Sequence, residues 1–378
     1  MDKVQKVIRG RGSLKKLPEM ASKLNISRPM IVGEPFLTGK LLRKVPTLLQ
    51  APVFSGFHSN PDLNDALEGV NLYRREACDG LIAIGGGSAL DTAKAIRTLL
   101  CIPSPEDAVK NRFPEELPEI PSIAAPATAG TGSEATQTAV VYVDGNKISL
   151  NHPCLKPDGV ILDADLLDSL PDYQKKSCAL DALAQGIESY WCLSSTDDSR
   201  VHAYLAILGV LDNLKAYLAG DPHAAEEMLD AANQSGKAIQ ITRTTAAHAM
   251  SYQLTKKYGI AHGHAVMITL PVLWEMAAEH EEMDGVLREM TGIMRLGDPL
   301  MVPRLLRGIM ADLGMSIPEV PDDPTLDSLT DSVNAERLNN HPVKLSRADI
   351  RDAYRRAMTP LCAAEKQACL DIWKYYNQ

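Results

Sequence analysis

The sequence predicts a protein of two parts, an α/β domain with a mostly parallel sheet followed by an all-α domain. Up to about Leu170, short apolar runs alternate with segments of helical apolar spacing, which is typical of a sheet covered by helices on both faces. Beyond that point helical patterns follow one another and strand signals are nearly absent. A chain of 378 residues is also too long for one typical core. We therefore expect two domains, residues 1–166 and 167–378.

The elements of the first domain follow from apolar runs and the turns between them. Strands are predicted at Pro29–Val32, Ala51–Phe54, Gly80–Ile84, Ile123–Ala125 and Val160–Asp163. Helical spacing predicts helices at Leu37–Leu49 and Leu63–Ala77. Thr138–Val143 and Lys147–Leu150 flank Asp144-Gly145-Asn146, which predicts a β-hairpin.

The second domain is predicted to be helical throughout. Its helical patterns begin after Pro171 and cover Ser177–Trp191, Ser199–Leu218, Ala224–Tyr252 and His264–His280, with more to the C-terminus. The segment Pro318–Pro324 is rich in Pro and Asp and predicts a surface loop within this domain.

Composition and charge exclude several classes of protein. The formal charge is −9 and no long basic cluster is present, which argues against binding to nucleic acid or to an anionic membrane. No apolar stretch is long enough to span a bilayer, and the N-terminus lacks the apolar core of a secretory signal. Seven scattered cysteines without a CxxC pair favour neither a disulfide framework nor a thiolate metal site. We expect a cytoplasmic protein.

A glycine-rich turn follows the predicted strand Gly80–Ile84. Gly85, Gly86 and Gly87 precede Ser88 and a helical pattern that contains Asp91. Glycines let backbone N–H groups approach a ligand, and the start of a helix adds unpaired N–H groups and a positive dipole end. The segment therefore predicts a phosphate-binding site for a nucleotide cofactor, the alternative being a tight turn alone.

A second loop of small residues, Pro126–Glu134, follows the predicted strand Ile123–Ala125. The hydroxyl groups of Thr128, Thr131 and Ser133 are suited to hydrogen bonds with phosphate or ribose oxygens. Taken alone it is also compatible with a flexible turn. Two such loops after two strands of one sheet strengthen the prediction of a nucleotide site.

Metal-ligating residue types occur on the predicted helices of the second domain. Asp181 and Gln185 are four residues apart and share one helix face. His248 follows on a later helix, and His262 and His264 come after a loop. A carboxylate with two imidazoles is a suitable ligand set for a divalent cation. The spacing leaves open whether these residues converge, because a helical Asp is usually solvated and a His is often a core or surface residue.

Together these segments resemble the iron-containing (group III) alcohol dehydrogenases. The segments that carry the resemblance are Gly85–Ser88 with Asp91 and Lys94, Pro126–Glu134, Asp181–Ala184 and Ile260–His264. The resemblance implies a dehydroquinate synthase-like fold, with an N-terminal dinucleotide-binding α/β domain and a C-terminal helical domain. It also implies an NAD(P)-dependent alcohol dehydrogenase or aldehyde reductase, with a divalent metal next to the nicotinamide. Asp181, His248 and His262 would occupy three metal-ligand positions.

Two positions depart from the family pattern. The pattern carries a His four residues after the Asp, where this chain has Gln185, and commonly another four residues after His248, where it has Tyr252. The Gln185 carbonyl oxygen can still bind a metal, but it is a weaker donor than imidazole for late first-row metals. We expect Fe²⁺ or Zn²⁺ at Asp181, Gln185, His248 and His262, held more weakly than usual. His264 and Tyr252 are candidates for supplying the proton to the product alkoxide.

Further segments resemble the phosphonoacetaldehyde reductase branch, which reduces phosphonoacetaldehyde to 2-hydroxyethylphosphonate in phosphonate biosynthesis. They are Thr242–Tyr252, Glu188–Trp191 and Val333–Pro342. Arg243 and Arg337 can each hold a phosphonate dianion by bidentate hydrogen bonds, unless both are structural or surface arginines. The alternatives are the same chemistry on another small aldehyde or alcohol, or a non-catalytic binding or scaffold subunit.

Glu34 ends the predicted strand that begins at Pro29. An acidic side chain near the end of a first strand can bond ribose hydroxyls and repel a 2′-phosphate, whereas a loop acid is otherwise solvated. We therefore expect NADH in preference to NADPH. We also expect a homodimer that acts on a small anionic aldehyde.

Overall fold

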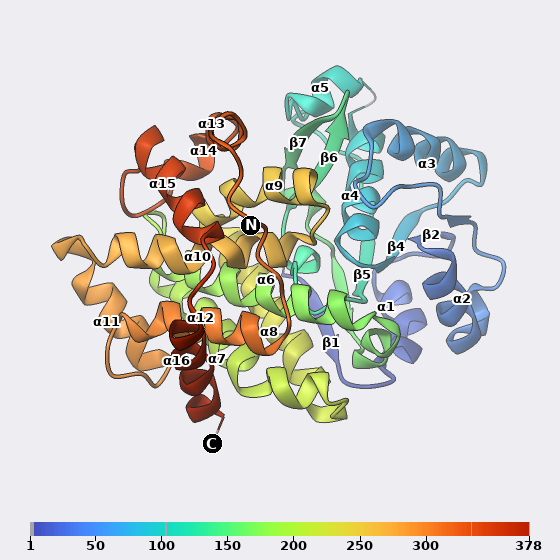
Figure 1. Ribbon diagram of the computed structural model, residues 1–378. Helices are drawn as coiled ribbons and strands as arrows, with labels where there is room; N and C mark the ends of the chain where they lie inside the picture. Colours follow the sequence, from blue (N-terminus) through green and yellow to red (C-terminus); the bar gives the residue numbers. More distant parts are fainter. Residues whose placement is uncertain (1–3, 103, 334, 378) are drawn as a thin grey trace. The chain divides into compact units, whose positions relative to one another are not determined.

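The computed structural model describes residues 4–102, 104–333 and 335–377, and the chain divides into two compact units (Figure 1). The first unit extends to Leu170 and also takes in Pro222–Gly236. The second comprises Pro171–Asp221 and the chain from Lys237 onward. The sequence had placed the boundary at 166/167, with residues 222–236 in the helical part.

The first unit is built on a six-stranded sheet in the order β1-β8-β5-β4-β2-β3, and every neighbouring pair is parallel. The strands are β1 (Lys6–Arg9), β2 (Pro29–Gly33), β3 (Val53–Phe54), β4 (Gly80–Gly85), β5 (Ser122–Pro126) and β8 (Gly159–Leu162). The antiparallel hairpin is β6 (Thr138–Val143) with β7 (Asn146–Asn151). The predicted parallel sheet and hairpin are confirmed.

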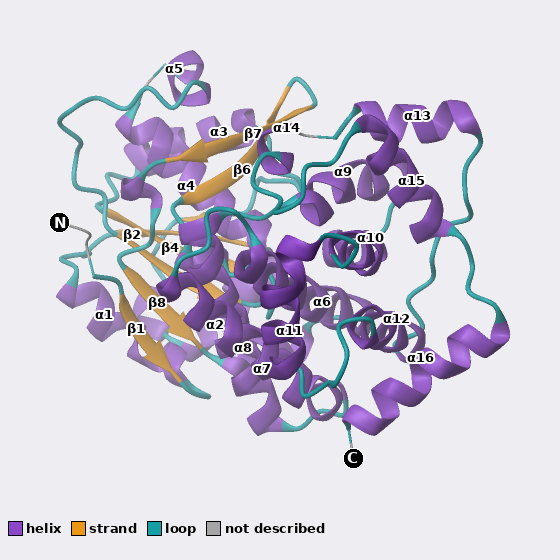
Figure 2. Cartoon of the chain, turned by 90° about the vertical axis from the view of Figure 1, so that its left-hand side faces the viewer, coloured by secondary structure: helices purple, strands orange, loops and turns teal. Residues whose placement is uncertain are grey.

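Helices cover both faces of this sheet (Figure 2). They are α1 (Leu17–Lys23), α2 (Pro35–Lys44), α3 (Leu63–Arg75), α4 (Gly87–Cys101) and α5 (Pro105–Val109). Ile31 and Ile82 pack in one apolar cluster with residues of α1 and α2, whereas Val32 and Ala83 pack in another with residues of α3 and α4. Because successive side chains of a strand point to opposite faces, strands buried on both faces are apolar throughout.

The edge strand β1 has no counterpart among the predicted strands. It has four residues, Lys6–Arg9, and a charged residue at each end encloses only two apolar ones. Such a short segment gives almost no alternation to recognise. Its pairing with β8 comes from the tertiary structure, with Val7 opposite Val160 and Ile8 opposite Ile161.

The second unit is helical in its described residues. Its helices are α6 (Asp172–Trp191), α7 (Asp197–Leu218), α9 (Ala246–Tyr258), α10 (His262–Ala277), α11 (Asp284–Ile293), α12 (Met301–Asp312), α13 (Asp323–Asp331), α14 (Ala335–Leu338), α15 (Arg347–Met358) and α16 (Ala363–Tyr376). Helix α10 packs against α6, α9, α12 and α15 and is buried along most of its length. An apolar helix of this kind forms the centre of a helical core. The predicted loop that starts at Pro318 is confirmed up to Asp322.

The prediction of one helix over Ala224–Tyr252 is wrong. Helix α8 spans Pro222–Thr242, and α9 begins only at Ala246. Arg243 between them has a left-handed backbone with φ of 62°, which no α-helix accommodates. The Asn340 side-chain amide donates to the carbonyl of Thr242 at 2.7 Å and so satisfies a group that the helix leaves unpaired.

Among the described residues, no helix has both the length and the hydropathy that crossing a bilayer requires.

Candidate active site

The two glycine-rich loops converge at the carboxyl ends of the neighbouring strands β4 and β5. A β-carbon on Gly86 would lie 3.2 Å from the methyl group of Thr128, and one on Gly87 would lie 3.2 Å from the methyl group of Thr131. Helix α4 starts at Gly87, and its N-cap residue makes no side-chain capping bond. The first N–H groups of α4 therefore remain for a ligand, as a phosphate site at a helix N-terminus requires.

Gly85 and Glu34 meet at this edge of the sheet. Gly85 has φ of +154°, and a β-carbon there would lie 2.5 Å from Glu34 Oε2 and 2.6 Å from Ala89 Cβ. Glycine tolerates both this backbone angle and the lack of space for a side chain. Glu34 Oε2 is buried and makes no hydrogen bond within the described residues, and burial raises the pKa of this carboxyl. An unsatisfied acceptor at the end of β2 is compatible with the hydroxyl donors of a ribose.

Three of the predicted nucleotide-binding residues also make hydrogen bonds within the protein. Asp91 Oδ1 accepts a hydrogen bond from Ser133 Oγ at 2.7 Å, and Asp91 Oδ2 accepts one from the backbone N–H of Val140 at 2.9 Å. Ser88 Oγ donates to the carbonyl of Ser59. These contacts fix the loops around the predicted nucleotide site, and the nucleotide-binding roles of Asp91, Ser88 and Ser133 stay predictions.

Lys94 stabilises the second loop, Pro126–Glu134, and the residues that follow it through hydrogen bonds. Its Nζ donates to the carbonyl and the hydroxyl of Ser133 at 2.6 and 2.9 Å, to Thr136 Oγ1 at 3.0 Å and to the Thr138 carbonyl at 2.8 Å. Burial lowers the pKa of Lys94 to about 8, although Asp91 and Glu134 oppose this. The side chain is therefore a structural support for residues 133–138.

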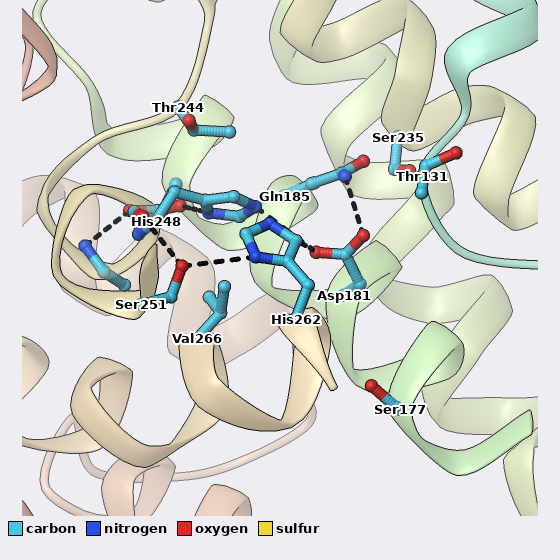
Figure 3. A network of polar contacts seen from close by, with 12 residues as sticks. Thr131, Ser177, Asp181, Gln185, Ser235, Thr244, His248, Ser251, His262 and Val266 are labelled. Atoms are coloured by element: carbon cyan, nitrogen blue, oxygen red, sulfur yellow. Dashed lines mark hydrogen bonds and ion pairs between the residues drawn. The ribbon is translucent and has the colours of Figure 1, made fainter. Parts of the chain in front are cut away.

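Three helices of the second unit bring the expected metal ligands together. Asp181 on α6, His248 on α9 and His262 on α10 each offer one ligand atom, and these atoms all lie within 4.8 Å of one another. Nε2 of His248 is 3.3 Å from Asp181 Oδ1, and Nε2 of His262 is 3.8 Å from the same oxygen. Figure 3 shows the three side chains turned toward one another. The sequence left this convergence open.

The residues fit a divalent cation. Nε2 of His248 is buried and makes no hydrogen bond among the described residues, yet it faces the Asp181 carboxylate. Burial alone would lower the pKa of His248, but the carboxylates of Glu188 and Asp181 raise it to about 9. The cluster thus favours a positive charge at Nε2, where a metal can replace the proton. His262 lies on the side of the cluster that is open to solvent, since 38% of its side chain is exposed.

Gln185 lies beside these ligands on helix α6. Its side-chain Nε2 donates to Asp181 Oδ2 at 3.2 Å, and the residue is only 4% exposed. The four-residue spacing therefore places it next to Asp181, as expected. Its role as a fourth ligand stays a prediction.

His264 is buried and has a polar partner at each ring nitrogen. It is 1% exposed, its Nδ1 is 3.0 Å from the Tyr173 hydroxyl, and its Nε2 lies 2.8 Å from the carbonyl of Ser316, to which it can donate. Both ring nitrogens are thereby satisfied in a neutral imidazole, and burial lowers the pKa. His264 thus anchors the start of α10, and its catalytic role stays a prediction.

Tyr252 remains a candidate for the proton source. Its ring stacks on the ring of His262, with centroids 5.9 Å apart and an interplanar angle of 11°. Tyr252 is also partly exposed. The residue that replaces a customary histidine thus lies against the open side of the metal cluster.

The two predicted substrate arginines differ in their surroundings. Arg337 Nη1 donates to Thr244 Oγ1, and Thr244 lies four residues before His248 on the linker between α8 and α9. Arg243 on the same linker is exposed and has the left-handed backbone described above. Arg337 is therefore hydrogen-bonded to the segment that leads to the candidate ligand His248, and the substrate roles of both arginines stay predictions.

Sequence reasoning assigned no role to two buried polar residues of this site, Glu188 and Ser251. Glu188 is fully buried, and its Oε2 contacts His248 Nδ1. Burial by itself would raise the pKa of the Glu188 carboxyl. The interactions with His248 and the hydrogen bond from Thr245 outweigh burial, so the pKa lies below its usual value. Its position seven residues after Asp181, two turns along the same helix face, is a signal that could have identified it.

Comparisons with known proteins agree on one family. Residues 4–164 match the family model of the iron-containing alcohol dehydrogenases, and residues 176–358 match that of the C-terminal part of Fe-containing alcohol dehydrogenases. The probable alcohol dehydrogenase EutG of Escherichia coli K12 is 33% identical over 281 residues, 70% of each chain. The phosphonoacetaldehyde reductase of Streptomyces viridochromogenes is 32% identical over 275 residues, 68% of this chain and 67% of that protein.

A solved structure extends the likeness over nearly the whole chain. The sulfoacetaldehyde reductase of Bifidobacterium kashiwanohense, crystallised in complex with NAD⁺, superposes with a TM-score of 0.86 at 25% identity. The match covers 94% of this chain and 97% of that one.

Proposed function

This chain belongs to the iron-containing alcohol dehydrogenase family, and we propose that it reduces phosphonoacetaldehyde to 2-hydroxyethylphosphonate with NADH. Membership makes the protein an oxidoreductase that interconverts an aldehyde and an alcohol. The observation that carries the proposal is the convergence of Asp181, His248 and His262 within 4.8 Å. This arrangement favours a catalytic role over a non-catalytic subunit, because a divalent cation held by these residues would polarise an aldehyde carbonyl.

The chain's own residues perform defined parts of the reaction. When bound, a divalent cation supplies Lewis-acid polarisation of the aldehyde carbonyl, and the dihydronicotinamide supplies the hydride. Asp181 and His248 hold their positions in a buried environment, where electrostatic interactions are strong. The exposed side of His262 admits the aldehyde. Tyr252 or water then supplies the proton that completes the alcohol.

The first unit supports a dinucleotide cofactor. The loops at Gly86 and Thr128 meet at the start of α4, where N–H groups suit a pyrophosphate. The buried Oε2 of Glu34 at the end of β2 has no hydrogen-bond partner within the described residues. A ribose hydroxyl would satisfy it, whereas a 2′-phosphate would be repelled, which favours NADH.

Arg337 supports the proposal that the substrate carries an anionic tail. A guanidinium group binds phosphonate through charge-assisted bonds that a neutral aldehyde cannot make. Among the relatives are proteins named phosphonoacetaldehyde reductase and sulfoacetaldehyde reductase, whose substrates share a small aldehyde with an anionic end. We propose that Arg337, with Arg243, holds that end.

The test compares aldehydes that differ in their tails. We expect NADH oxidation to be faster, in kcat/KM, with phosphonoacetaldehyde than with sulfoacetaldehyde, lactaldehyde or acetaldehyde. Loss of one charge-assisted contact costs about 10- to 100-fold. Arg337→Leu should therefore reduce kcat/KM for phosphonoacetaldehyde by about that factor and leave acetaldehyde within about threefold.

A matched control is Arg288→Leu, which removes an exposed arginine paired with Asp284 on helix α11. This variant should keep the wild-type preference. Equal activity on charged and neutral aldehydes in the wild-type enzyme would reject phosphonoacetaldehyde as the substrate. Failure of the metal-loaded protein to oxidise NADH with any aldehyde would reject the reductase itself.

A further inference from the structure

We propose that Glu188 and Ser251 are positioning residues that set the tautomers of the two metal-binding histidines, so that both Nε2 lone pairs face Asp181. The proposal rests on the metal-binding part of the proposed function and does not depend on which aldehyde is reduced. It concerns two buried side chains that neither reach solvent nor belong to the ligand cluster.

The hydrogen bonds around Glu188 fix the orientation of its carboxylate relative to His248. Its Oε1 accepts from the backbone N–H of Thr245 at 3.2 Å, from Thr245 Oγ1 at 2.6 Å and from the N–H of Ala247 at 2.9 Å. Its Oε2 faces His248 Nδ1. An ionised carboxylate only accepts hydrogen bonds, so Nδ1 must carry a hydrogen. Nε2 of His248 is then the nitrogen that gives up its proton and presents a lone pair when a metal binds.

Ser251 fixes the tautomer of His262 in a similar way, through a hydroxyl group in place of a carboxylate. Its Oγ donates to the carbonyl of His248 at 2.8 Å and lies 3.3 Å from His262 Nδ1. A hydroxyl has one hydrogen, and the carbonyl takes it. The remaining contact therefore requires that Nδ1–H of His262 donates to Oγ. Nε2 of His262, 3.8 Å from Asp181 Oδ1, keeps its lone pair.

The arrangement gives helix α6 two functions in one cluster. Asp181 supplies a ligand oxygen, and Glu188, two turns later on the same helix, orients the ligand on α9. Glu188 also satisfies N–H groups at the start of α9, which would otherwise be orphaned. Residues that orient metal ligands typically change metal affinity by about 10- to 100-fold when they are replaced.

The decisive variant is Glu188→Gln. Its carbonyl oxygen can still accept from Thr245 and Ala247, but its amide N–H₂ then faces His248 Nδ1 and donates to it. The hydrogen of the imidazole is moved to Nε2, so the lone pair no longer faces Asp181. We expect the affinity for Co²⁺, titrated into the metal-depleted protein, to fall by about 10- to 100-fold. The visible absorption spectrum of bound Co²⁺ should change as well.

Three further variants separate orientation from stability. Ser251→Ala should weaken Co²⁺ binding by about 3- to 10-fold, because His262 loses its partner and its fixed tautomer. Ser189→Ala is the matched control, since Ser189 is equally buried and its Oγ also has one polar side-chain partner, Thr242 Oγ1 at 3.1 Å. It should bind Co²⁺ within about twofold of wild type. Thr245→Val removes the hydroxyl donor to Glu188 Oε1 but keeps the two backbone donors and the contact at Nδ1. It should therefore lower the melting temperature and change the Co²⁺ affinity by less than about threefold.

The proposal is overturned if folded Glu188→Gln binds Co²⁺ with wild-type affinity and spectrum. If Glu188→Gln does not fold, Ser251→Ala decides, and an affinity equal to that of Ser189→Ala overturns the proposal. A wild-type protein that binds neither Co²⁺ nor Zn²⁺ overturns it together with the metal mechanism. A wild-type protein that binds Co²⁺ but reduces no aldehyde rejects the proposed function, while the affinities of the variants still decide this proposal.

Discussion

Gly263 packs directly against helix α6 beside Asp181. A β-carbon at Gly263 would lie 2.7 Å from the Asp181 β-carbon and 2.0 Å from the carbonyl oxygen of Ser177, closer than non-bonded atoms approach. The absence of a side chain therefore lets the first turn of α10 rest on α6. Because His262 precedes Gly263, this contact brings its imidazole toward Asp181 Oδ1, 3.8 Å away.

We predict that Gly263→Ala weakens metal binding. The new methyl group must push α10 away from α6, which moves His262 from Asp181 and strains the core. Metal affinity should fall by more than about tenfold, with a loss of stability of about 1–3 kcal/mol. Isothermal titration with Zn²⁺ and chemical denaturation measure the two effects.

Gly285→Ala is the control for this substitution. Gly285 lies in α11, and a β-carbon there would meet no atom within 4 Å. Replacing a helical glycine in open space stabilises by up to about 1 kcal/mol and should leave Zn²⁺ affinity unchanged. Equal affinities for the two variants would show that the Gly263 contact does not position His262.

Glu34→Ser should shift cofactor preference toward NADPH. The substitution removes a carboxylate from the end of β2, and with it the repulsion of a 2′-phosphate. We expect the ratio of kcat/KM for NADPH to that for NADH to rise by at least about tenfold, the effect of one charge–charge contact. An unchanged ratio would mean that the carboxylate of Glu34 does not face the ribose.

Gln185→His should strengthen metal retention. The imidazole replaces an amide that now donates to Asp181 Oδ2 at 3.2 Å, and nitrogen is the better donor for late first-row metals. The rate need not rise, because an additional strong donor reduces the pull of the cation on the carbonyl. Metal content after dialysis against a chelator tests this. Identical losses from variant and wild type would place Gln185 outside the ligand shell.

His341 should make the folded state sensitive to acid. It is buried, its ring meets that of Trp191 edge-on at 5.6 Å, and its Nδ1 makes no hydrogen bond within the described residues. Burial lowers its pKa to about 4, although Glu188 opposes this. As the pH falls from 6.5 to 4, the unfolded state takes up a proton that the folded state does not. The free energy of unfolding therefore decreases over this window, by about 3 kcal/mol from this residue.

His341→Phe keeps a ring against Trp191 and removes the titration. Denaturation curves of both proteins should give a difference in unfolding free energy that is constant above pH 6.5 and shifts in favour of the variant toward pH 4. Parallel pH profiles would show that His341 is protonated in the folded protein as readily as in the unfolded one.

Much of the architecture is visible in the sequence because it depends on local patterns. Buried parallel strands such as Gly80–Gly85 are continuous apolar runs, and the three glycines after them mark the loop. The break at Arg243 carries no such mark, since neither Gly nor Pro is present and the left-handed turn depends on Asn340 from far along the chain. The edge strand β1 depends in the same way on pairing with β8.

The residues of the site also divide into those that the sequence indicates and those that depend on tertiary packing. Residue types indicated Asp181, His248 and His262 as candidate metal ligands, and the family resemblance implied one shared site. Their spacing left the convergence open, and the structure brings them together. His264 differs from His262 by two positions and points to another set of partners, Tyr173 and Ser316. On a helix, a shift of two residues turns a side chain to the opposite face, and only the packing of α10 tells which of the two faces Asp181.

The most direct test of the account is the aldehyde reductase activity of Asp181→Ala beside its metal content and its NADH binding. Asp181 is the anionic member of the cluster, and both histidine Nε2 atoms face its Oδ1. We expect the wild-type protein to retain a divalent metal and to oxidise NADH with phosphonoacetaldehyde. Asp181→Ala should lose both properties, while NADH still binds, because the glycine-rich loops belong to the first unit. Undiminished aldehyde reduction by Asp181→Ala would rule out a metal-dependent reaction at this cluster.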